Sequence, residues 1–524
     1  MRCFRCPGAA TLFLYVHFQM IDHTPFWFIF IMTCIIILRS VAPLSVAYSA
    51  ILILLPHCSY RLPSLLEYWA IAEALFYLAF YFYRTYHLQR PAVHPPLPPI
   101  EKRRELFERC LRNIPDYERY ISKWFLGVPL DNIERENVKD FFCWAFLNTA
   151  TAGSAQDDEI EEYVRKLEEA IGREFQPGRS NAKCLRLTID NATILHRSLV
   201  WYLCVLVVDA VTYSYMLLHK FRFHRPSFTH AFSIFPPRPQ ALIGANKSHA
   251  KRLTYWYRPH TSCNKLPILF LHGIGIGLYP YVNFLAELNQ QDVDGDGEVG
   301  IIAVEILHIS FRIAGGALTK DEFCMQLWTV LQSHGFDEFV LVSHSYGSVI
   351  TTHLLHSLEF SNRITSVIMV DPVSILLHLP DAAYNFMIRK PKLANEWQLW
   401  YFASKDAGVA HTISRHFFWS ENILWKEDIA HYRSTIFLSD RDLLVDASQV
   451  YMYLLGPESD HKTSNLNCMG AKNAAESNET QQLNVVWCTN LDHGQIFESK
   501  QWREQLVTEV LSHIARHGNR DTKN

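Results

Sequence analysis

The segment Leu341–Ile350, with sequence LVSHSYGSVI, places a serine where an apolar run changes to helical spacing. Ser345 stands at this predicted strand-to-helix turn, and Gly347 follows two residues later. The backbone of such a turn is crowded, so its neighbours must be small and the serine side chain points outward. The amino end of the next helix also favours negative charge there. The pattern predicts a nucleophilic serine. Ser343 occupies the place of a usual glycine, and a serine-rich turn without catalytic function is the alternative.

A candidate base and a candidate acid follow two later apolar runs, and nucleophilic catalysis by serine needs both. His493 lies in the loop after NVVWCT, and Asp442 follows STIFLS. A histidine at this position can take the serine proton, and a carboxylate can orient the histidine and stabilise its imidazolium form. Asp371 also follows an apolar run and is the alternative acid. Pro372 directly after Asp371 favours Asp442.

The glycine-rich segment HGIGIG, residues 272–277, follows another apolar run and is a candidate oxyanion loop. Backbone N–H groups in such a turn can bind the negative charge of an acyl intermediate. A flexible loop or a phosphate-binding turn is the alternative. Leu278 stands where the G-x-G-x-x-G pattern requires its last glycine, and no P-loop lysine follows, so phosphate binding is disfavoured.

Six short apolar runs predict the elements that position these groups. The runs are LPILFLHG, GIIAVEI, EFVLVSHS, ITSVIMVDP, STIFLSD and NVVWCT, and helix-length segments separate them. Such strands form a mostly parallel sheet buried on both faces, with ligand sites beyond the carboxyl ends of the strands. Because the candidate groups all follow such runs, we expect them to meet at one edge of an α/β sheet.

The order and context of these motifs resemble the α/β-hydrolase superfamily over residues 253–516. LFLHGIG, LVSHSYGS, LSDRDLLVD and LDHG stand where that family has its oxyanion loop, nucleophile elbow, acid and histidine. The whole chain resembles membrane-associated members of the superfamily that occur in fungi and have no assigned substrate. The expected fold is therefore an α/β-hydrolase domain with a lid insertion at about residues 372–433, preceded by an all-helical, membrane-associated region.

The resemblance assigns a role to each candidate residue. Ser345 is expected to attack an acyl carbonyl, His493 to take its proton, and Asp442 to hold His493. An oxyanion hole is expected from the backbone N–H groups of Tyr346 and Ile274, with Gly275 as a neighbouring candidate. Epoxide hydrolase and dehalogenase chemistry need an acidic nucleophile, which Ser345 disfavours. No metal or other cofactor is expected.

Residues 1–89 are expected to anchor the chain in a membrane. Thr24–Pro56 is apolar nearly throughout, and Glu67–Tyr83 is a second, marginal span because Glu73 lies inside it. A membrane helix needs about 20 apolar residues, so the first stretch holds one tilted span or two short ones. Helices buried in a soluble domain are the alternative. Basic residues after the second run place the following chain in the cytosol.

The predicted order of regions is an anchor (1–89), a proline-rich linker (90–100), a helical region (101–240), the hydrolase domain (253–516) and a tail (517–524). The helical region includes an apolar helix, residues 196–221, with Asp209 in its middle. This helix either enters the bilayer or packs against the next domain, and the sequence alone leaves both alternatives open.

Composition limits the possible functions. Lys and Arg total 49 and Asp and Glu 52, a net charge of −3, so there is no electrostatic case for nucleic-acid binding. Charged residues make up 19% of the chain, below the roughly 25% of soluble chains, which indicates membrane contact. The predicted function is a serine hydrolase of small-molecule or lipid esters on an intracellular membrane. An acyltransferase and an inactive, membrane-anchored binding protein are the alternatives.

Overall fold

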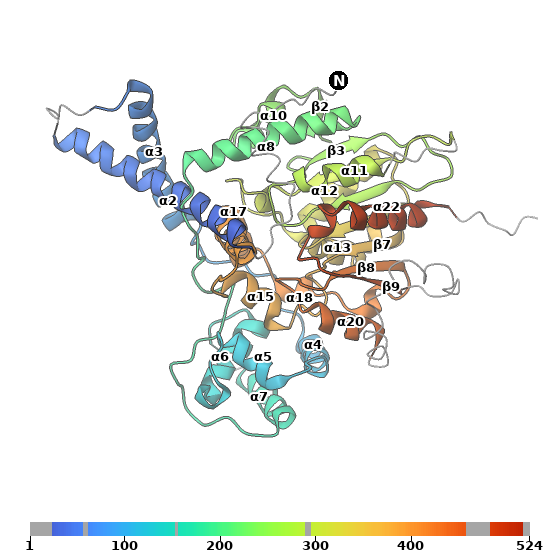
Figure 1. Cartoon of the computed structure of the whole chain (residues 1–524). Coiled ribbons are helices and arrows are strands. Elements are labelled where there is room, and N and C mark those ends of the chain that lie inside the picture. Colours follow the sequence, from blue (N-terminus) through green and yellow to red (C-terminus); the bar gives the residue numbers. More distant parts are fainter. Residues whose placement is uncertain are drawn as a thin grey trace, which may run out of the picture.

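The computed structural model describes residues 24–55, 61–151, 153, 156–288, 295–456 and 483–516. The predicted tail and the first 23 residues of the predicted anchor lie outside these ranges. Figure 1 shows a central sheet covered by helices, a smaller group of helices beside it, and two helices that project away from both.

A nine-stranded sheet lies at the centre, with strand order β2-β1-β3-β5-β4-β6-β7-β8-β9. Its strands are β1 (Arg222–Arg225), β2 (Asn246–Lys247), β3 (Thr254–Arg258), β4 (Ile268–Leu271), β5 (Ile301–Glu305), β6 (Phe339–His344), β7 (Ile364–Val370), β8 (Arg433–Ser439) and β9 (Leu483–Cys488). The strands from β4 to β9 pair in parallel, and β3 is antiparallel to both of its neighbours. The six predicted strands and the mostly parallel sheet are confirmed.

The sheet begins earlier in the chain than predicted. β1 pairs with β3, so that His224 lies opposite Tyr255, although β1 falls in the region 101–240 that was predicted to be helical. The expected domain start at residue 253 is therefore too late. The sequence of β1 is RFHR, which is short and mostly charged and gives no apolar alternation from which a strand is recognised.

Alternating side chains on the strands enter two separate cores. In β6, Val340 and Val342 join one core and Leu341 joins the other, because successive residues of a strand face opposite sides. Helices α12 (Lys320–Ser333) and α13 (Gly347–Leu355) cover the Leu341 face. Helices α11 (Val282–Glu287) and α22 (Lys500–Ile514) cover the other. Further short helices are α9 (Phe228–Ala231), α10 (Pro239–Ile243), α14 (Leu358–Ser361) and α20 (Ala447–Leu455).

Helices also fill the interval between β7 and β8, where the lid is predicted. They are α15 (Pro380–Met387), α16 (Ala394–Gln398), the π-helix η5 (Leu399–Ser404), α17 (Ala407–Arg415), α18 (Trp419–Asn422) and α19 (Lys426–Ile429). The smaller helical group consists of α4 (Ile100–Arg112), α5 (Tyr117–Trp124), α6 (Arg135–Leu147) and α7 (Asp157–Ile171). Lys123 and Arg119 of α5 pair with Asp381 of α15, so this group is attached to the lid interval.

In the part of the chain that the structure describes, three helices are long and apolar enough to cross a membrane: α2 (Pro25–Leu54), α3 (Ser64–Phe82, continued to His87 by the π-helix η1) and α8 (Leu199–Leu218). α2 and α3 lie side by side and project from the rest of the molecule (Figure 1). Most of their side chains are exposed, as expected of surfaces that face lipid.

Asp209, in the middle of α8, decides where that helix packs. Its carboxylate is 5% exposed and pairs with Arg312 and, at 3.3 Å, with Arg238. Arg238 also donates two hydrogen bonds of 2.8 Å to Glu305 at the end of β5. Burial alone would raise the pKa of Glu305, but the Arg238 guanidinium lowers it to about 2. This buried ionic network holds the middle of α8 on the sheet domain, so the packing alternative is correct there.

Candidate active site

Ser345 occupies a strained turn between β6 and α13. Its φ is 50°, a left-handed conformation that non-glycine residues rarely adopt. A Cβ on Gly347 would lie 2.4 Å from the carbonyl oxygen of Leu271 in β4, which explains the requirement for glycine at this position. At the other side of the turn, the buried Ser343 hydroxyl accepts a 2.9 Å hydrogen bond from Thr351. Serine is tolerated there because its hydroxyl has a partner.

The three residues predicted to act together lie in one chain of hydrogen bonds. His493 Nε2 is 2.7 Å from Ser345 Oγ, and His493 Nδ1 is 2.7 Å from Asp442 Oδ2. The other carboxylate oxygen of Asp442 accepts from the N–H groups of Leu444 at 2.7 Å and Val445 at 3.0 Å. These two bonds fix the carboxylate, and the carboxylate in turn fixes the imidazole for removal of the serine proton.

Asp371, the alternative acid, has a different set of partners. Its carboxylate accepts from the Ser439 N–H at 2.8 Å, the Ser439 hydroxyl at 3.0 Å and the Gly494 N–H at 2.8 Å. The His493 ring is not among its hydrogen-bond partners in the described structure. Burial, and the nearby charge of Asp442, raise the pKa of Asp371 to about 6. The geometry therefore favours Asp442 as the acid. Asp371 instead holds the backbone next to His493 through its bond from Gly494.

The surroundings of His493 favour its protonated form. Burial alone would lower its pKa, but the charge and hydrogen bond of Asp442, with smaller effects of Asp371 and Asp492, raise that pKa to about 9. The carboxylates around His493 therefore stabilise an imidazolium next to the serine.

Asp492 is a site residue that was not predicted. One of its carboxylate oxygens accepts from the N–H groups of Leu443 at 3.0 Å and His493 at 2.7 Å. The other oxygen accepts from the Asn395 amide of α16 at 2.7 Å. Asp492 thus connects the loop that carries Asp442, the loop that carries His493, and α16 of the lid interval. Its position directly before the histidine, in LDHG, is the only signal in the sequence.

Two of the three predicted oxyanion donors remain available. Within the described ranges, neither the Tyr346 N–H nor the Ile274 N–H has an acceptor. The Gly275 N–H donates to the Ile309 carbonyl at 3.2 Å, so this N–H is occupied in the structure. The loop that contains Ile309 could not be placed from the sequence. Gly273 lies against the nucleophile, because a Cβ there would be 2.8 Å from that of Ser345.

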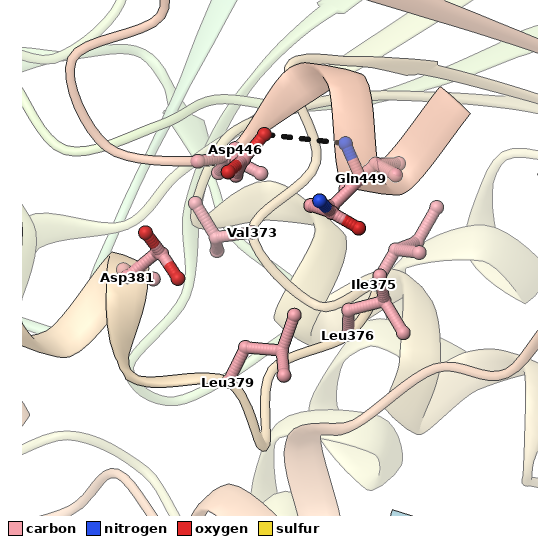
Figure 2. Close-up of a pocket in the computed structure, with 10 residues that line it drawn as sticks. Val373, Ile375, Leu376, Leu379, Asp381, Asp446 and Gln449 are labelled. Atoms are coloured by element: carbon pink, nitrogen blue, oxygen red, sulfur yellow. Dashed lines mark hydrogen bonds between the residues drawn. The ribbon is translucent and has the colours of Figure 1, made fainter. Parts of the chain in front are cut away.

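The structure shows the site in a closed state. Ser345 is 4% exposed. A nearby pocket of about 10 Å³, between the lid interval and α20, has room for about one water molecule. Figure 2 shows its apolar wall facing Asp446, whose side chain accepts a 3.2 Å hydrogen bond from the Gln449 N–H. The wall consists of Val373, Ile375, Leu376 and Leu379.

Comparison with known protein families gives a match over part of the chain. Residues 267–449 match the family model described as the alpha/beta hydrolase fold, a range that includes Ser345 and Asp442 and ends before His493. The central sheet and this match show that the chain has the α/β-hydrolase fold predicted from its sequence. A search of curated protein sequences finds no match.

Many solved structures resemble the chain at low identity. A bacterial membrane phospholipase A is 11% identical with a TM-score of 0.34, over 60% of this chain and 94% of that one. A carboxylesterase structure from Nitrososphaera gargenis is 12% identical with a TM-score of 0.32, over 50% and 94%. The carboxylesterase CesB of Bacillus subtilis is 11% identical with a TM-score of 0.31, over 58% and 98%.

Proposed function

We propose that this protein is a serine hydrolase that cleaves carboxylic esters. The observation that supports this most directly is the continuous hydrogen-bond chain from Asp442 through His493 to Ser345, with 2.7 Å at each step. The free N–H groups of Tyr346 and Ile274 add the donors that such a reaction needs. An inactive binding protein has no use for this alignment, which argues against that alternative.

The proposed reaction has two halves. Ser345 Oγ attacks the acyl carbon while its proton passes to His493 Nε2, and the N–H groups of Tyr346 and Ile274 bind the oxyanion. The ester C–O bond then breaks, and the alcohol leaves with the proton from His493. In the second half, water gives a proton to His493 and attacks the acyl-enzyme, which releases the acid and restores Ser345. Asp442 stays ionised throughout.

Acyl transfer is the nearest alternative, because an alcohol that replaces water in the second half gives a new ester. Ser345 is 4% exposed, so water access depends on the lid. The products distinguish the two reactions. A hydrolase releases free fatty acid from an ester in detergent regardless of added alcohol, whereas a transferase produces the new ester in proportion to it.

We further propose that α2 and α3 form a membrane hairpin beside the lid. Ile31 and Ile35, near the start of α2, pack against Tyr401 of η5. Phe80, near the end of α3, and Leu88, just after η1, pack with α17. Two spans return the chain to the side on which it started, and both of these ends contact the lid interval. This arrangement supports a lipid ester as substrate, because the lid lies where the helices leave the bilayer.

Membrane attachment is testable by extraction at high pH. The protein is expected to stay in the membrane fraction of an intracellular membrane after carbonate washing, because two apolar helices hold it there. Lysine at both Ile36 and Ile37, which are 59% and 57% exposed in the middle of α2, should release a large part of it. Lysine at Leu358, which is 86% exposed on the hydrolase domain, is the control. Complete release of the unaltered protein would contradict the hairpin.

Substrate length is testable with p-nitrophenyl esters presented in detergent. We expect kcat/KM to rise from acetate to octanoate. Each methylene of the acyl chain that is buried contributes about 0.8 kcal/mol of transfer free energy. Burial of two methylenes should therefore raise kcat/KM on the order of tenfold. Replacing Phe417, whose ring centre is 6.2 Å from that of Tyr346, by alanine should reduce this preference. Phe232, which is 77% exposed, provides the matched control. An optimum at acetate would contradict an acyl pocket under the lid.

A further inference from the structure

Three histidines from separate segments converge at one edge of the sheet. His224 lies in β1, His249 in the loop between β2 and β3, and His334 directly after α12. Each histidine contributes one ring nitrogen, and these three nitrogens all lie within 4.8 Å of one another. Among the described residues only one other such group occurs, and it contains the proposed catalytic pair Asp442 and His493.

The histidine cluster, His224, His249 and His334, is far from the active site. Strands β3, β5 and β4 separate β1 from β6, which ends at the turn that carries Ser345. His334 leads into the amino end of β6, whereas Ser345 follows its carboxyl end. The cluster therefore has no part in the ester chemistry.

Two tyrosines of β3 hold the rings of this cluster. Tyr255, opposite His224 in the sheet, stacks on its ring with 4.6 Å between centres. The Tyr255 hydroxyl is 3.1 Å from His249 Nδ1 and 2.9 Å from His334 Nε2. Tyr257 stacks on His334 at 3.8 Å. The hydroxyl has one proton and can donate to only one of the two nitrogens, so the cluster is rich in acceptors.

One ring nitrogen of this cluster is buried without a partner among the described residues. His224 is 7% exposed, and its Nδ1 is buried without a hydrogen-bond partner. A buried nitrogen without a partner costs free energy, and a bound cation removes that cost.

We propose that His224, His249 and His334 bind a divalent transition-metal ion of the zinc class. Imidazole nitrogens suit this class, with metal–nitrogen distances of about 2.0–2.1 Å. Nitrogens around a tetrahedral ion are about 3.3 Å apart, so the spacing of up to 4.8 Å must shorten by at most about 1.5 Å. His249 is exposed and gives the ion a path from solvent. The Tyr255 hydroxyl, or water, supplies the fourth position.

The bound ion would connect the end strands of the sheet to α12. β1 and β2 are short strands at the end of the sheet, with four and two residues. A metal bound by His224, His249 and His334 fastens β1 and the loop after β2 to the end of α12. The chain continues from α12 into β6, which ends at the turn that carries Ser345. The role is structural: the ion binds the folded state and should raise its melting temperature.

The experiment uses the full chain in detergent, purified without a histidine tag and stripped with a chelator. Titration with Co²⁺ should give visible absorption bands of an imidazole complex that saturate at one ion per chain, and Zn²⁺ should displace them. His249→Ala and His334→Ala should each weaken binding at least about tenfold, since even outer-shell partners contribute 10- to 100-fold. Zn²⁺ should raise the melting temperature of the unaltered protein but not of these two variants.

His431→Ala is the matched control, because His431 is exposed and lies outside the cluster. It should bind Co²⁺ as the unaltered protein does. Fluorophosphonate labelling of Ser345 should persist in His249→Ala, which separates this proposal from the proposed hydrolase function and shows that the variant is folded. Absence of saturable Co²⁺ binding to the unaltered protein would overturn the metal site. Binding to His249→Ala and His334→Ala as tight as to the unaltered protein would also overturn it.

Discussion

Replacing Ser345 with alanine is expected to abolish covalent labelling by a fluorophosphonate and to reduce ester turnover on the order of 10⁶-fold. The change removes the hydroxyl oxygen that lies 2.7 Å from His493 Nε2, so no acyl-enzyme can form. Labelling is measured on a gel with the detergent-solubilised chain, and turnover with a chromogenic ester. Because the hydrogen bond is already present in the closed structure, the loss should not depend on the acyl chain of the ester.

Ser343→Ala is the matched control, since Ser343 lies two residues away and its hydroxyl accepts a hydrogen bond from Thr351. This variant should label as the unaltered protein does. Ser348→Ala should also label, but with reduced stability, because the Ser348 hydroxyl accepts from the N–H groups of Val373 and Ser374. Labelling that survives in Ser345→Ala would show that the nucleophile is another residue.

Replacing Asp442 with asparagine is expected to lower kcat about 10⁴-fold. Asparagine has nearly the same shape, so the loop should stay in place. Its amide no longer stabilises the imidazolium, however, and can hold His493 in the wrong tautomer. Single-turnover kinetics with a chromogenic ester measures the loss. Asp371→Asn should cost far less, because Asp371 contacts the neighbouring backbone and Ser439 instead of the imidazole.

The pH profile separates these two carboxylates further. His493 acts as a base only when neutral, so with a pKa near 9 the value of kcat/KM should rise with pH into the alkaline range. Above its own pKa of about 6, Asp371 is charged and favours the imidazolium. Asp371→Asn should therefore move the rising limb to lower pH while activity persists. A greater loss of turnover in Asp371→Asn than in Asp442→Asn would assign the acid to β7.

The proposed catalytic residues could be located from the sequence because each follows a strand. Ser345, Asp442 and His493 stand directly after runs of apolar, β-branched residues, and the geometry of a parallel sheet brings such ends together. Gly275 shows the limit of this reasoning. Glycine-rich sequence marks a loop near the site, but which N–H remains free depends on a carbonyl in another loop, that of Ile309.

Contacts between distant segments were not visible in the sequence. The chain has 25 histidines, and nothing in the spacing of His224, His249 and His334 marks them as neighbours. Strand β1, which carries the first of them, lacks apolar alternation because it is short and charged. Likewise, the position of α8 depends on Arg312, which is 103 residues from Asp209 and gives no local signal.

The contact between α2 and the lid has a consequence for where the protein is active. α2 has 30 residues and is about 45 Å long at 1.5 Å per residue, whereas a hydrocarbon core is about 30 Å thick. With α2 in the membrane as proposed, the helix must tilt or leave one end outside the core, and the balance changes with bilayer thickness. Ile31 and Ile35, which pack on η5, lie near one end of α2. Thickness mismatch at that helix is therefore transmitted to the helices over Ser345, so turnover should differ between thin and thick bilayers of the same headgroup composition.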